Sequence, residues 1–203
     1  MPKYSGNDHY IDPESGVLKN RFGITDEALL EVAEADFVAE RSRELSETPI
    51  QGRFDLAHLQ AIHRHLFGDV YEWAGELRTV DISKGGSMFA HHAHIASAAA
   101  PIFKQLAEEK HLAGLDPGAF SDRAAHYLGE LNALHPFREG NGRAQREFVS
   151  HLAHRTGYYV AWENVKRYEM LAASIASFKG DTAKLAGLIR ENLFPLDVEM
   201  PTS

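Results

Sequence analysis

Apolar residues recur at helical spacing along most of the chain, and polar or turn-forming residues separate these segments. Repeats at i, i+3 and i+4 are typical of helices that bury one face. Thr25, followed by Asp26 and Glu27, is the predicted N-cap of the first of them. The pattern predicts helices over about residues 25–45, 55–67, 94–112, 117–134, 142–156, 164–178 and 181–193.

One segment follows a different pattern. Residues 79–83 alternate in polarity, Gly85 and Gly86 interrupt them, and a second apolar run covers residues 88–90. Alternation on both sides of a glycine pair predicts a small β-hairpin. A single hairpin cannot form the core of a sheet, so we expect a flap over a helical body. The predicted fold class is therefore all-α, a helical bundle with one small β-hairpin.

The ends of the chain lack this periodicity. Residues 1–24 are rich in turn-forming residues and predict an arm packed on one domain of residues 25–193, while residues 194–203 predict a tail or the start of a linker. The N-terminus has no apolar signal-peptide core, and no stretch has the length of a membrane span. We therefore expect a cytoplasmic location.

The amino-acid composition excludes several classes of functional site. The 203 residues include no cysteine, which excludes disulfides, thiolate metal sites and a cysteine nucleophile. The 29 acidic and 21 basic residues give a formal net charge of −8, which argues against a general nucleic-acid surface. Any anion must therefore be held by a local cluster of positive groups that works against the overall field.

The segment from His135 to Arg146, HPFREGNGRAQR, offers such a cluster. Pro136 ends one predicted helix, and a loop with two glycines opens the next. The free N–H groups of a glycine-rich loop and the dipole of a helix N-terminus both favour an anion. Arg143 and Arg146 are three residues apart and share a helix face, and Arg138 adds a third cation. Two arginines at such a loop suggest more than one phosphate.

Three further side chains complete the hypothesis. Glu139 would repel a phosphate unless a divalent cation, usually Mg²⁺, lies between them. His135 could take a proton from an incoming hydroxyl, and Phe137 would anchor the loop to the core. On the residues alone, a plain helix–loop–helix turn, with Arg143 paired to Glu147, is an equally good interpretation.

The same twelve residues resemble the signature of Fic-domain enzymes, His-x-Phe-x-Asp/Glu-Gly-Asn-Gly-Arg-x-x-Arg, at every fixed position. Residues 12–20 and 71–75 are also similar to bacterial Fic toxins. The resemblance implies a Fic fold and a protein adenylyltransferase, which moves AMP from ATP to a target hydroxyl. It implies that His135 is the general base and Glu139 the Mg²⁺ ligand. Arg143 would contact the β- or γ-phosphate and Arg146 the γ-phosphate, and the anion hole for the α- and β-phosphates would be formed by Gly140, Asn141 and Gly142.

The resemblance also implies finer features. Relatives that transfer the γ-phosphate replace the Gly-Asn-Gly-Arg portion, so the intact Gly142 and Arg143 favour nucleotidyl transfer. The hairpin of such enzymes clamps the target by strand addition. Ile82, Ser83 and Lys84 are the target-positioning residues expected here.

Fic enzymes are commonly inhibited by a helix with the motif Ser/Thr-x-x-x-Glu-Gly/Asn, whose glutamate pairs with the second motif arginine, here Arg146. In this chain Glu139, Glu163 and Glu191 precede Gly or Asn, but none has Ser or Thr four residues earlier. We therefore expect a toxin inhibited by a separate small antitoxin that carries this motif. The resemblance suggests a tyrosine of DNA gyrase B or of the topoisomerase IV E subunit as the target.

Two alternative functions remain open, and one group of histidines has no role in this hypothesis. The same loop could transfer another nucleotide or a phosphate group, or the domain could be a non-catalytic module that senses nucleotide. His91, His92 and His94 resemble a metal patch, but the sequence shows no convergent further ligand. We therefore interpret them, like His63 and His65, as solvated or packing histidines.

Overall fold

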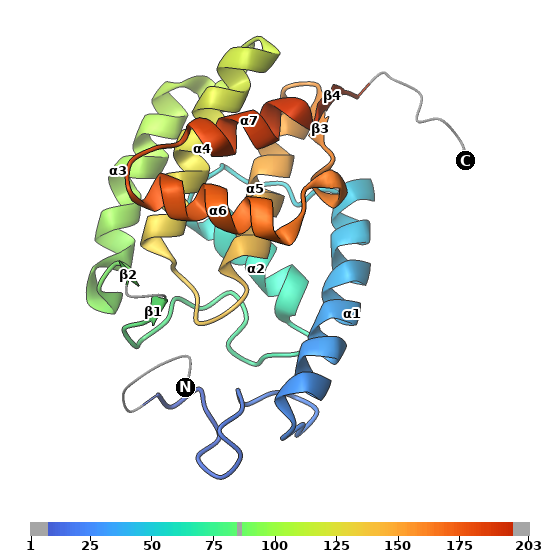
Figure 1. The fold of residues 1–203 in the computed structure, drawn as a ribbon, viewed down its shortest axis with the longest axis vertical. Helices are drawn as coiled ribbons and strands as arrows, with labels where there is room; N and C mark the ends of the chain where they lie inside the picture. The colour runs from blue at the N-terminus through green and yellow to red at the C-terminus, as the bar shows by residue number, and fades with distance from the viewer. Residues whose placement is uncertain (1–7, 85–86, 197–203) are drawn as a thin grey trace.

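The computed structural model describes residues 8–84 and 87–196. Within these ranges the fold is mostly helical, with two small two-stranded antiparallel sheets, of which β1–β2 is a hairpin (Figure 1). The elements are α1 (Glu27–Glu47), α2 (Leu56–Phe67), β1 (Ser83–Lys84), β2 (Ser87–Met88), η1 (His92–His94), α3 (Ile95–Glu108), η2 (Lys110–Leu112), α4 (Pro117–Leu134), α5 (Asn141–Arg155), β3 (Tyr158–Val160), η3 (Trp162–Asn164), α6 (Arg167–Phe178), α7 (Ala183–Glu191) and β4 (Leu193–Pro195). The predicted all-α class with a small hairpin is confirmed.

Helix α4 is central in the bundle. It packs against α3, α5, α6 and α7, while α2 packs against α5 and α1 packs against α2. Figure 1 shows α6 and α7 side by side across one face and α1 upright along one edge. Because α4 and α5 lie in the middle, the loop between them is supported by the core on one side and faces the hairpin and the N-terminal arm on the other.

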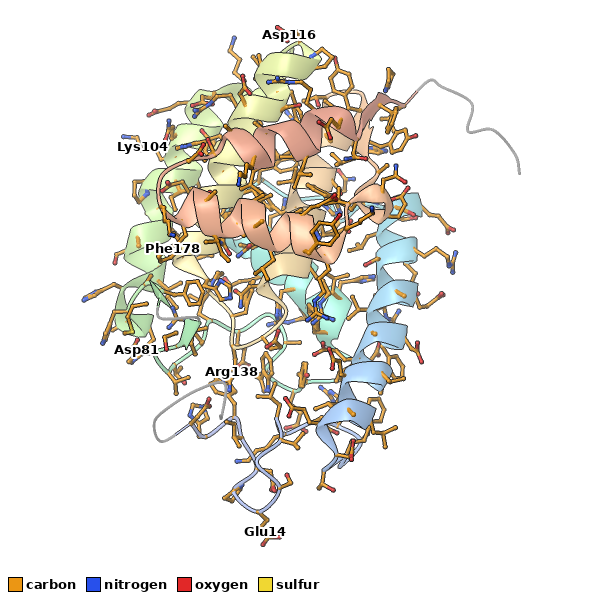
Figure 2. All side chains as sticks on the ribbon, viewed as in Figure 1. Glu14, Asp81, Lys104, Asp116, Arg138 and Phe178 are labelled. Atoms are coloured by element: carbon orange, nitrogen blue, oxygen red, sulfur yellow. The ribbon has the colours of Figure 1, made fainter. Side chains whose placement is uncertain are left out.

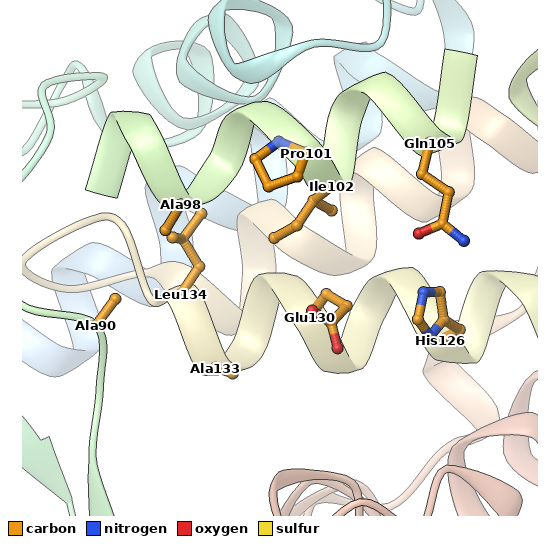
Figure 3. A pocket seen from close by; sticks show the side chains of 9 residues that line it. All are labelled: Ala90, Ala98, Pro101, Ile102, Gln105, His126, Glu130, Ala133 and Leu134. Carbon is orange, nitrogen blue, oxygen red and sulfur yellow. The ribbon is translucent and has the colours of Figure 1, made fainter. Parts of the chain in front are cut away.

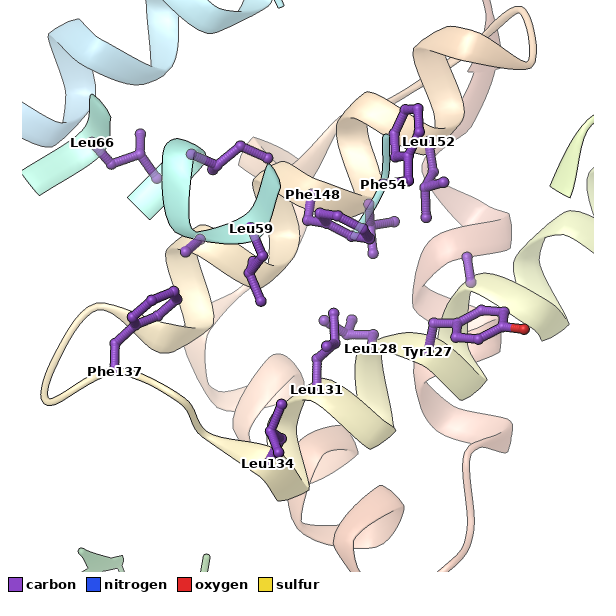
Figure 4. Packing of buried hydrophobic residues seen from close by; sticks show 14 of the residues in the cluster. Phe54, Leu59, Leu66, Tyr127, Leu128, Leu131, Leu134, Phe137, Phe148 and Leu152 are labelled. Carbon is purple, nitrogen blue, oxygen red and sulfur yellow. The ribbon is translucent and has the colours of Figure 1, made fainter. Parts of the chain in front are cut away.

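The hydrophobic core joins this loop to the rest of the bundle (Figure 4). Leu59 of α2, Leu131 of α4 and Phe148 of α5 are almost fully buried, and Phe137 of the loop itself is 0% exposed. Complete burial of a phenylalanine side chain is worth about 1.5–3 kcal/mol. The loop that carries the motif is therefore anchored by the same core that holds the helices.

Aspartate side chains begin three of the helices. Asp26, Asp55 and Asp116 each accept hydrogen bonds from backbone N–H groups of the first turn that follows. Such caps satisfy donors that have no partner inside the helix. The predicted cap at Thr25 is wrong by one residue, because Asp26 offers a carboxylate at the position from which it reaches the amide of Leu29.

Two other expectations from the sequence are corrected. The helix expected over residues 94–112 is shorter, since α3 ends at Glu108 and the chain turns through left-handed backbone at Lys110, His111 and Leu112. A second two-stranded antiparallel sheet pairs β3 with β4, so Phe194 and Pro195 belong to a strand rather than to an unstructured end. Strands of three residues are too short to display a period of two.

The N-terminal segment packs on the bundle from residue 8 onward. Tyr10 and Val17 are buried, and an isolated bridge pairs Ile11 with Leu18. None of the helices in the described part of the chain combines the length and the apolar character that a membrane-spanning helix needs.

Candidate active site

The loop between α4 and α5 is closed by its own side chains. His135 ends α4 in the left-handed conformation (φ 46°). Phe137 N–H donates to Asn141 Oδ1 (2.9 Å), and Asn141 Nδ2 donates to the Phe137 carbonyl (2.7 Å). Gly140 has φ 78°, and a Cβ there would overlap the ring of Phe67. The Asn141 side chain is thus used to shape the loop, and its backbone N–H is the group left for a ligand.

His63 of α2 packs against this loop and hydrogen-bonds to it. Its ring stacks on Phe137 with centroids 3.8 Å apart. Gly75 N–H donates to His63 Nδ1 (2.9 Å), so Nε2 carries the hydrogen and donates to the Glu139 carbonyl (2.9 Å). Burial lowers the pKa of His63 to about 4, which keeps the ring neutral at pH 7. The interpretation of His63 as a packing histidine is confirmed.

His135 is oriented by one hydrogen bond and one ring contact. Its Nδ1 lies 3.1 Å from the Asn132 carbonyl, an acceptor, so Nδ1 carries the hydrogen of the neutral ring. Nε2 is then the basic nitrogen. Phe89, which follows the β1–β2 hairpin, stacks on the ring with centroids 3.8 Å apart. The geometry therefore presents an imidazole in the tautomer that a general base requires.

The first turn of α5 provides backbone donors. Among the described residues, the N–H groups of Asn141 and Gly142 donate no hydrogen bond, as expected at a helix N-terminus. A Cβ on Gly142 would meet only Arg146 Nη1, at 3.5 Å. With the helix dipole, these amides form a site suited to the oxygens of a phosphate.

Arg143 is held by α1. Its Nη2 donates to Glu34 Oε1 (2.5 Å), and its guanidinium lies over the ring of Phe67, 4.7 Å from the centroid. Tyr71 donates to the other oxygen of Glu34 (2.5 Å), and burial raises the pKa of that phenol. The alternative pairing of Arg143 with Glu147 does not occur. The arginine is fixed by a buried carboxylate from a distant helix.

Arg146 lies one turn further along α5. No carboxylate in residues 8–84 or 87–196 forms an ion pair with it. Burial and the neighbouring Arg143 lower its pKa from the ordinary value for arginine. A desolvated cation beside a second cation attracts an anion strongly, because the surroundings supply little compensating charge.

Glu139 is the acidic residue of the loop. One of its carboxylate oxygens accepts from Gly140 N–H (3.0 Å), which directs the side chain toward the start of α5. Mg²⁺ commonly binds one or two carboxylates and takes its other ligands from substrate phosphates and water. A single carboxylate beside a helix N-terminus suited to phosphate fits this donor set.

Arg138 does not join the positive cluster, contrary to the sequence hypothesis. Its side chain is buried and forms an ion pair with Asp8 of the N-terminal arm (2.7 Å). Figure 2 shows Arg138 on the side of the motif loop that faces the arm. The cluster thus consists of Arg143 and Arg146, and the third arginine fastens the arm to the loop.

The hairpin lies beside His135, as expected of a flap. Ile82 is only 4% exposed, so its side chain points into the fold and only its backbone can serve a target. Ser83 is half-buried and pairs with Met88, which is exposed. The backbone of Lys84 lies in β1, but its side chain is outside the described part of the structure.

Arg78 joins the flap to the motif loop. Its fully buried guanidinium donates to the carbonyls of His135 (2.8 Å), Val80 (2.8 Å) and Ala90. Val80 and Ala90 stand on either side of the hairpin, so one side chain fixes both of its ends to the residue that ends α4. Carbonyl groups buried in this way need a partner, and Arg78 supplies it.

A groove of about 400 Å³ runs between α3 and α4 (Figure 3). Ala90, Ile102, Glu130 and Leu134 are among the residues that line it, and none of residues 135–146 does. The groove is therefore adjacent to the flap but separate from the motif.

The residues that support the motif were not connected with it from the sequence, although His63 was expected to pack in the fold. Glu34, His63, Phe67, Tyr71, Arg78 and Phe89 are all outside the twelve-residue segment. The one available signal was Glu34, an acidic residue spaced four residues from Leu30 and Val38 on the buried face of α1. A charged side chain on the buried, apolar face of a helix implies an oppositely charged or hydrogen-bonding partner.

Comparison with known proteins supports a single family. Residues 53–153 match the Fic/DOC family. Protein adenylyltransferase VbhT of Bartonella schoenbuchensis is 56% identical over 194 residues, which cover 95% of this chain but 41% of VbhT. The probable protein adenylyltransferase Fic of Escherichia coli is 38% identical over 181 residues, 89% of each chain. The structure of BepC from Bartonella tribocorum with bound AMPPNP has a TM-score of 0.87 at 28% identity and covers 92% of this chain and 96% of that one.

Proposed function

The chain belongs to the Fic/DOC family of protein adenylyltransferases, and from this premise we propose that it transfers AMP from ATP to a hydroxyl group of a target protein. The observation that carries the proposal is the arrangement of His135, Arg143 and Arg146 around the start of α5. Binding of AMPPNP by BepC is consistent with an ATP site in this fold. A tyrosine is the acceptor we expect.

The reaction needs alignment and charge neutralisation more than covalent help. The N–H groups of Asn141 and Gly142 would hold the α- and β-phosphates at the helix N-terminus, with Gly140 shaping the turn. Arg143 would contact the β- or γ-phosphate and Arg146 the γ-phosphate. Their two positive charges would hold the leaving pyrophosphate.

His135 would act on the target hydroxyl. Its Nε2 would take the proton as the hydroxyl oxygen attacks the α-phosphorus. The bond from that phosphorus to the bridging oxygen breaks, and pyrophosphate leaves with the electron pair. Glu139 would hold a Mg²⁺ ion, which supplies positive charge to the phosphate oxygens. Phe137 anchors the loop, and the backbone of residues 82–84 would align the target strand.

Incubation of a bacterial lysate with the protein and ATP labelled at the α-phosphate tests this function. We expect label in protein, and loss of at least about a hundredfold in rate for His135→Ala, since general-base catalysis contributes about 10²–10⁴. His154→Ala, a change at an exposed histidine of the same helix α5, is the matched control. Equal labelling by His135→Ala would contradict the proposed role.

We further propose that the protein is a bacterial toxin inhibited in trans by a small antitoxin with a Ser/Thr-x-x-x-Glu-Gly/Asn helix. The support is that no described carboxylate pairs with Arg146, so the inhibitory glutamate would come from another chain. DNA gyrase B and the topoisomerase IV E subunit are the proposed targets, reached in the cytoplasm or after delivery within a longer effector. VbhT is more than twice the length of the matched region.

Expression without a partner should impair bacterial growth, and His135→Ala should relieve the effect. Purified gyrase B and topoisomerase IV E subunit should each gain label from α-labelled ATP. Equal toxicity of the His135→Ala variant would exclude catalysis as the cause, and unlabelled subunits would exclude these targets while leaving AMP transfer intact.

For the domain organisation, we propose that residues 25–193 form the Fic domain and residues 1–24 an arm. The buried pair of Asp8 and Arg138 and the burial of Tyr10 support this arm. Because residues 194 and 195 complete β4, the proposed tail or linker begins after that strand.

A further inference from the structure

Three side chains converge at the base of the flap. Asp81 lies two residues before β1, and His91 and His92 follow β2. His91 Nε2 is 3.2 Å from Asp81 Oδ2, and His92 Nδ1 is 3.0 Å from Asp81 Oδ1. One ligand atom from each residue can be chosen so that all lie within 4.8 Å of one another. Figure 2 shows Asp81 at this end of the hairpin.

The backbone holds this cluster together independently of the rings. The N–H group of His92 donates to Asp81 Oδ1 (2.8 Å), which fixes the carboxylate across the hairpin. The rings of His91 and His92 stack with centroids 4.5 Å apart, so both face the same carboxylate. The guanidinium of Arg78 lies 3.7 Å from Asp81 Oδ1 and orients it from the buried side.

The donor set is that of a transition-metal site. Two imidazoles and one carboxylate are common ligands of Zn²⁺, with bonds of about 2.0–2.2 Å. A tetrahedral ion with such bonds holds its ligands roughly 3.3 Å apart. The 3.0 and 3.2 Å separations already approach this value. The fourth position would be left to water.

We propose that Asp81, His91 and His92 bind a divalent transition-metal ion, with Zn²⁺ as the reference ion, and that this ion clips together the two ends of the flap. The sequence analysis interpreted His91, His92 and His94 as solvated or packing histidines because it showed no convergent ligand, and the structure places Asp81 in that position for His91 and His92. The site is independent of the proposed adenylyl transfer, since neither His135 nor Glu139 takes part in it.

Ion binding requires only small changes. The three side chains are 35–54% exposed, so the ion reaches them from solvent. Each neutral ring would move its hydrogen to its other nitrogen, and the two N–H···O bonds to Asp81 would be replaced by metal bonds. His91 would also lose the long bond that its Nδ1 accepts from Ala93 N–H (3.3 Å). The bond from His92 N–H to the carboxylate is retained.

A metal ion at this position would hold the two ends of the flap together. The ion would join residue 81 to residues 91 and 92 across the hairpin. Phe89, which stacks on His135, lies inside the clipped segment. Metal binding would thus restrict the opening of the flap next to the motif loop.

Calorimetric titration of Zn²⁺ into the tag-free protein without nucleotide tests the site. We expect one ion per chain, and affinity at least about tenfold weaker in Asp81→Asn and in His91→Gln. His154→Gln and Glu139→Gln, which alter another histidine and the motif carboxylate, should bind within twofold of the parent protein. Equal affinity in the Asp81 and His91 variants, or no binding by the parent at millimolar Zn²⁺, would overturn the proposal.

Two controls keep the test decisive. Circular dichroism melts establish that each variant is folded, and Asp81→Asn retains an oxygen for the His92 N–H bond. Hydrogen exchange then measures the flap itself: Zn²⁺ should slow exchange in peptides from the flap of the parent protein and leave Asp81→Asn unchanged. Site-specific binding without any slowing would overturn the clip.

Discussion

His63 is a buried histidine whose two nitrogens are both used by backbone groups. Its pKa of about 4 is below the ordinary 6.5 because burial disfavours the charged ring. The unfolded chain therefore binds a proton more readily, and stability is lost as pH falls from about 6.5 toward 4. From pH 7 to pH 5 this residue should account for a loss of about 2 kcal/mol.

Urea unfolding at several pH values measures this effect. His63→Gln keeps one donor and one acceptor and cannot be protonated, so its free energy of unfolding should depend less on pH across this interval. Identical pH dependence in the two proteins would mean that His63 is not the neutral support that its contacts indicate.

Replacement of Glu34 should weaken the binding of ATP. Its carboxylate fixes Arg143, and hydrogen bonds to charged groups contribute about 1.5–3 kcal/mol. Glu34→Gln keeps the shape and the bond from Tyr71, and should raise the KM for ATP by at least about tenfold with a smaller change in kcat. Glu31→Gln, on the exposed face of the same helix, is the control. An unchanged KM for Glu34→Gln would show that Arg143 needs no positioning by α1.

At the scale of elements, the start of α5 depends on one glycine. Gly140 combines a positive φ with close contact to Phe67, whereas Gly157 has a similar φ and open space around its Cβ position. An alanine in the left-handed region costs about 1–2 kcal/mol at either place. Gly140→Ala must also displace the ring and should be destabilised by about 1–3 kcal/mol more than Gly157→Ala. Thermal or urea unfolding of the two variants measures the difference. Equal losses of stability would show that the Phe67 ring moves aside without cost.

The elements also show what a sequence can and cannot predict. The helices around the motif were predicted to within a few residues, because a helix that buries one face repeats apolar residues at helical spacing over its whole length. The pairing of β3 with β4 was missed, since both strands are short and more than thirty residues separate Val160 from Leu193. Phe137 was expected to face the core and does. Arg138 was assigned to the anion site, although its buried pairing with Asp8 depends on the path of the arm.

At the scale of the whole molecule, distant segments meet at one loop. Helix α1 contributes Glu34, α2 contributes His63 and Phe67, the segment between α2 and β1 contributes Tyr71 and Arg78, and the arm contributes Asp8. These contacts span up to 130 positions in the sequence, which is why local patterns do not reveal them. The acidic chain thus keeps two arginines, Arg143 and Arg146, in the first turns of α5, with Glu34 paired to Arg143.

The proposed activity is transfer of the nucleotidyl group of ATP at this loop, with His135 as the base. A single reaction tests it most directly: a bacterial lysate, Mg²⁺, the protein, and ATP carrying different isotopes at the α- and γ-phosphates. We expect the added protein to introduce only the α label into protein, at a rate at least about a hundredfold lower with His135→Ala. Incorporation of the γ label would contradict it.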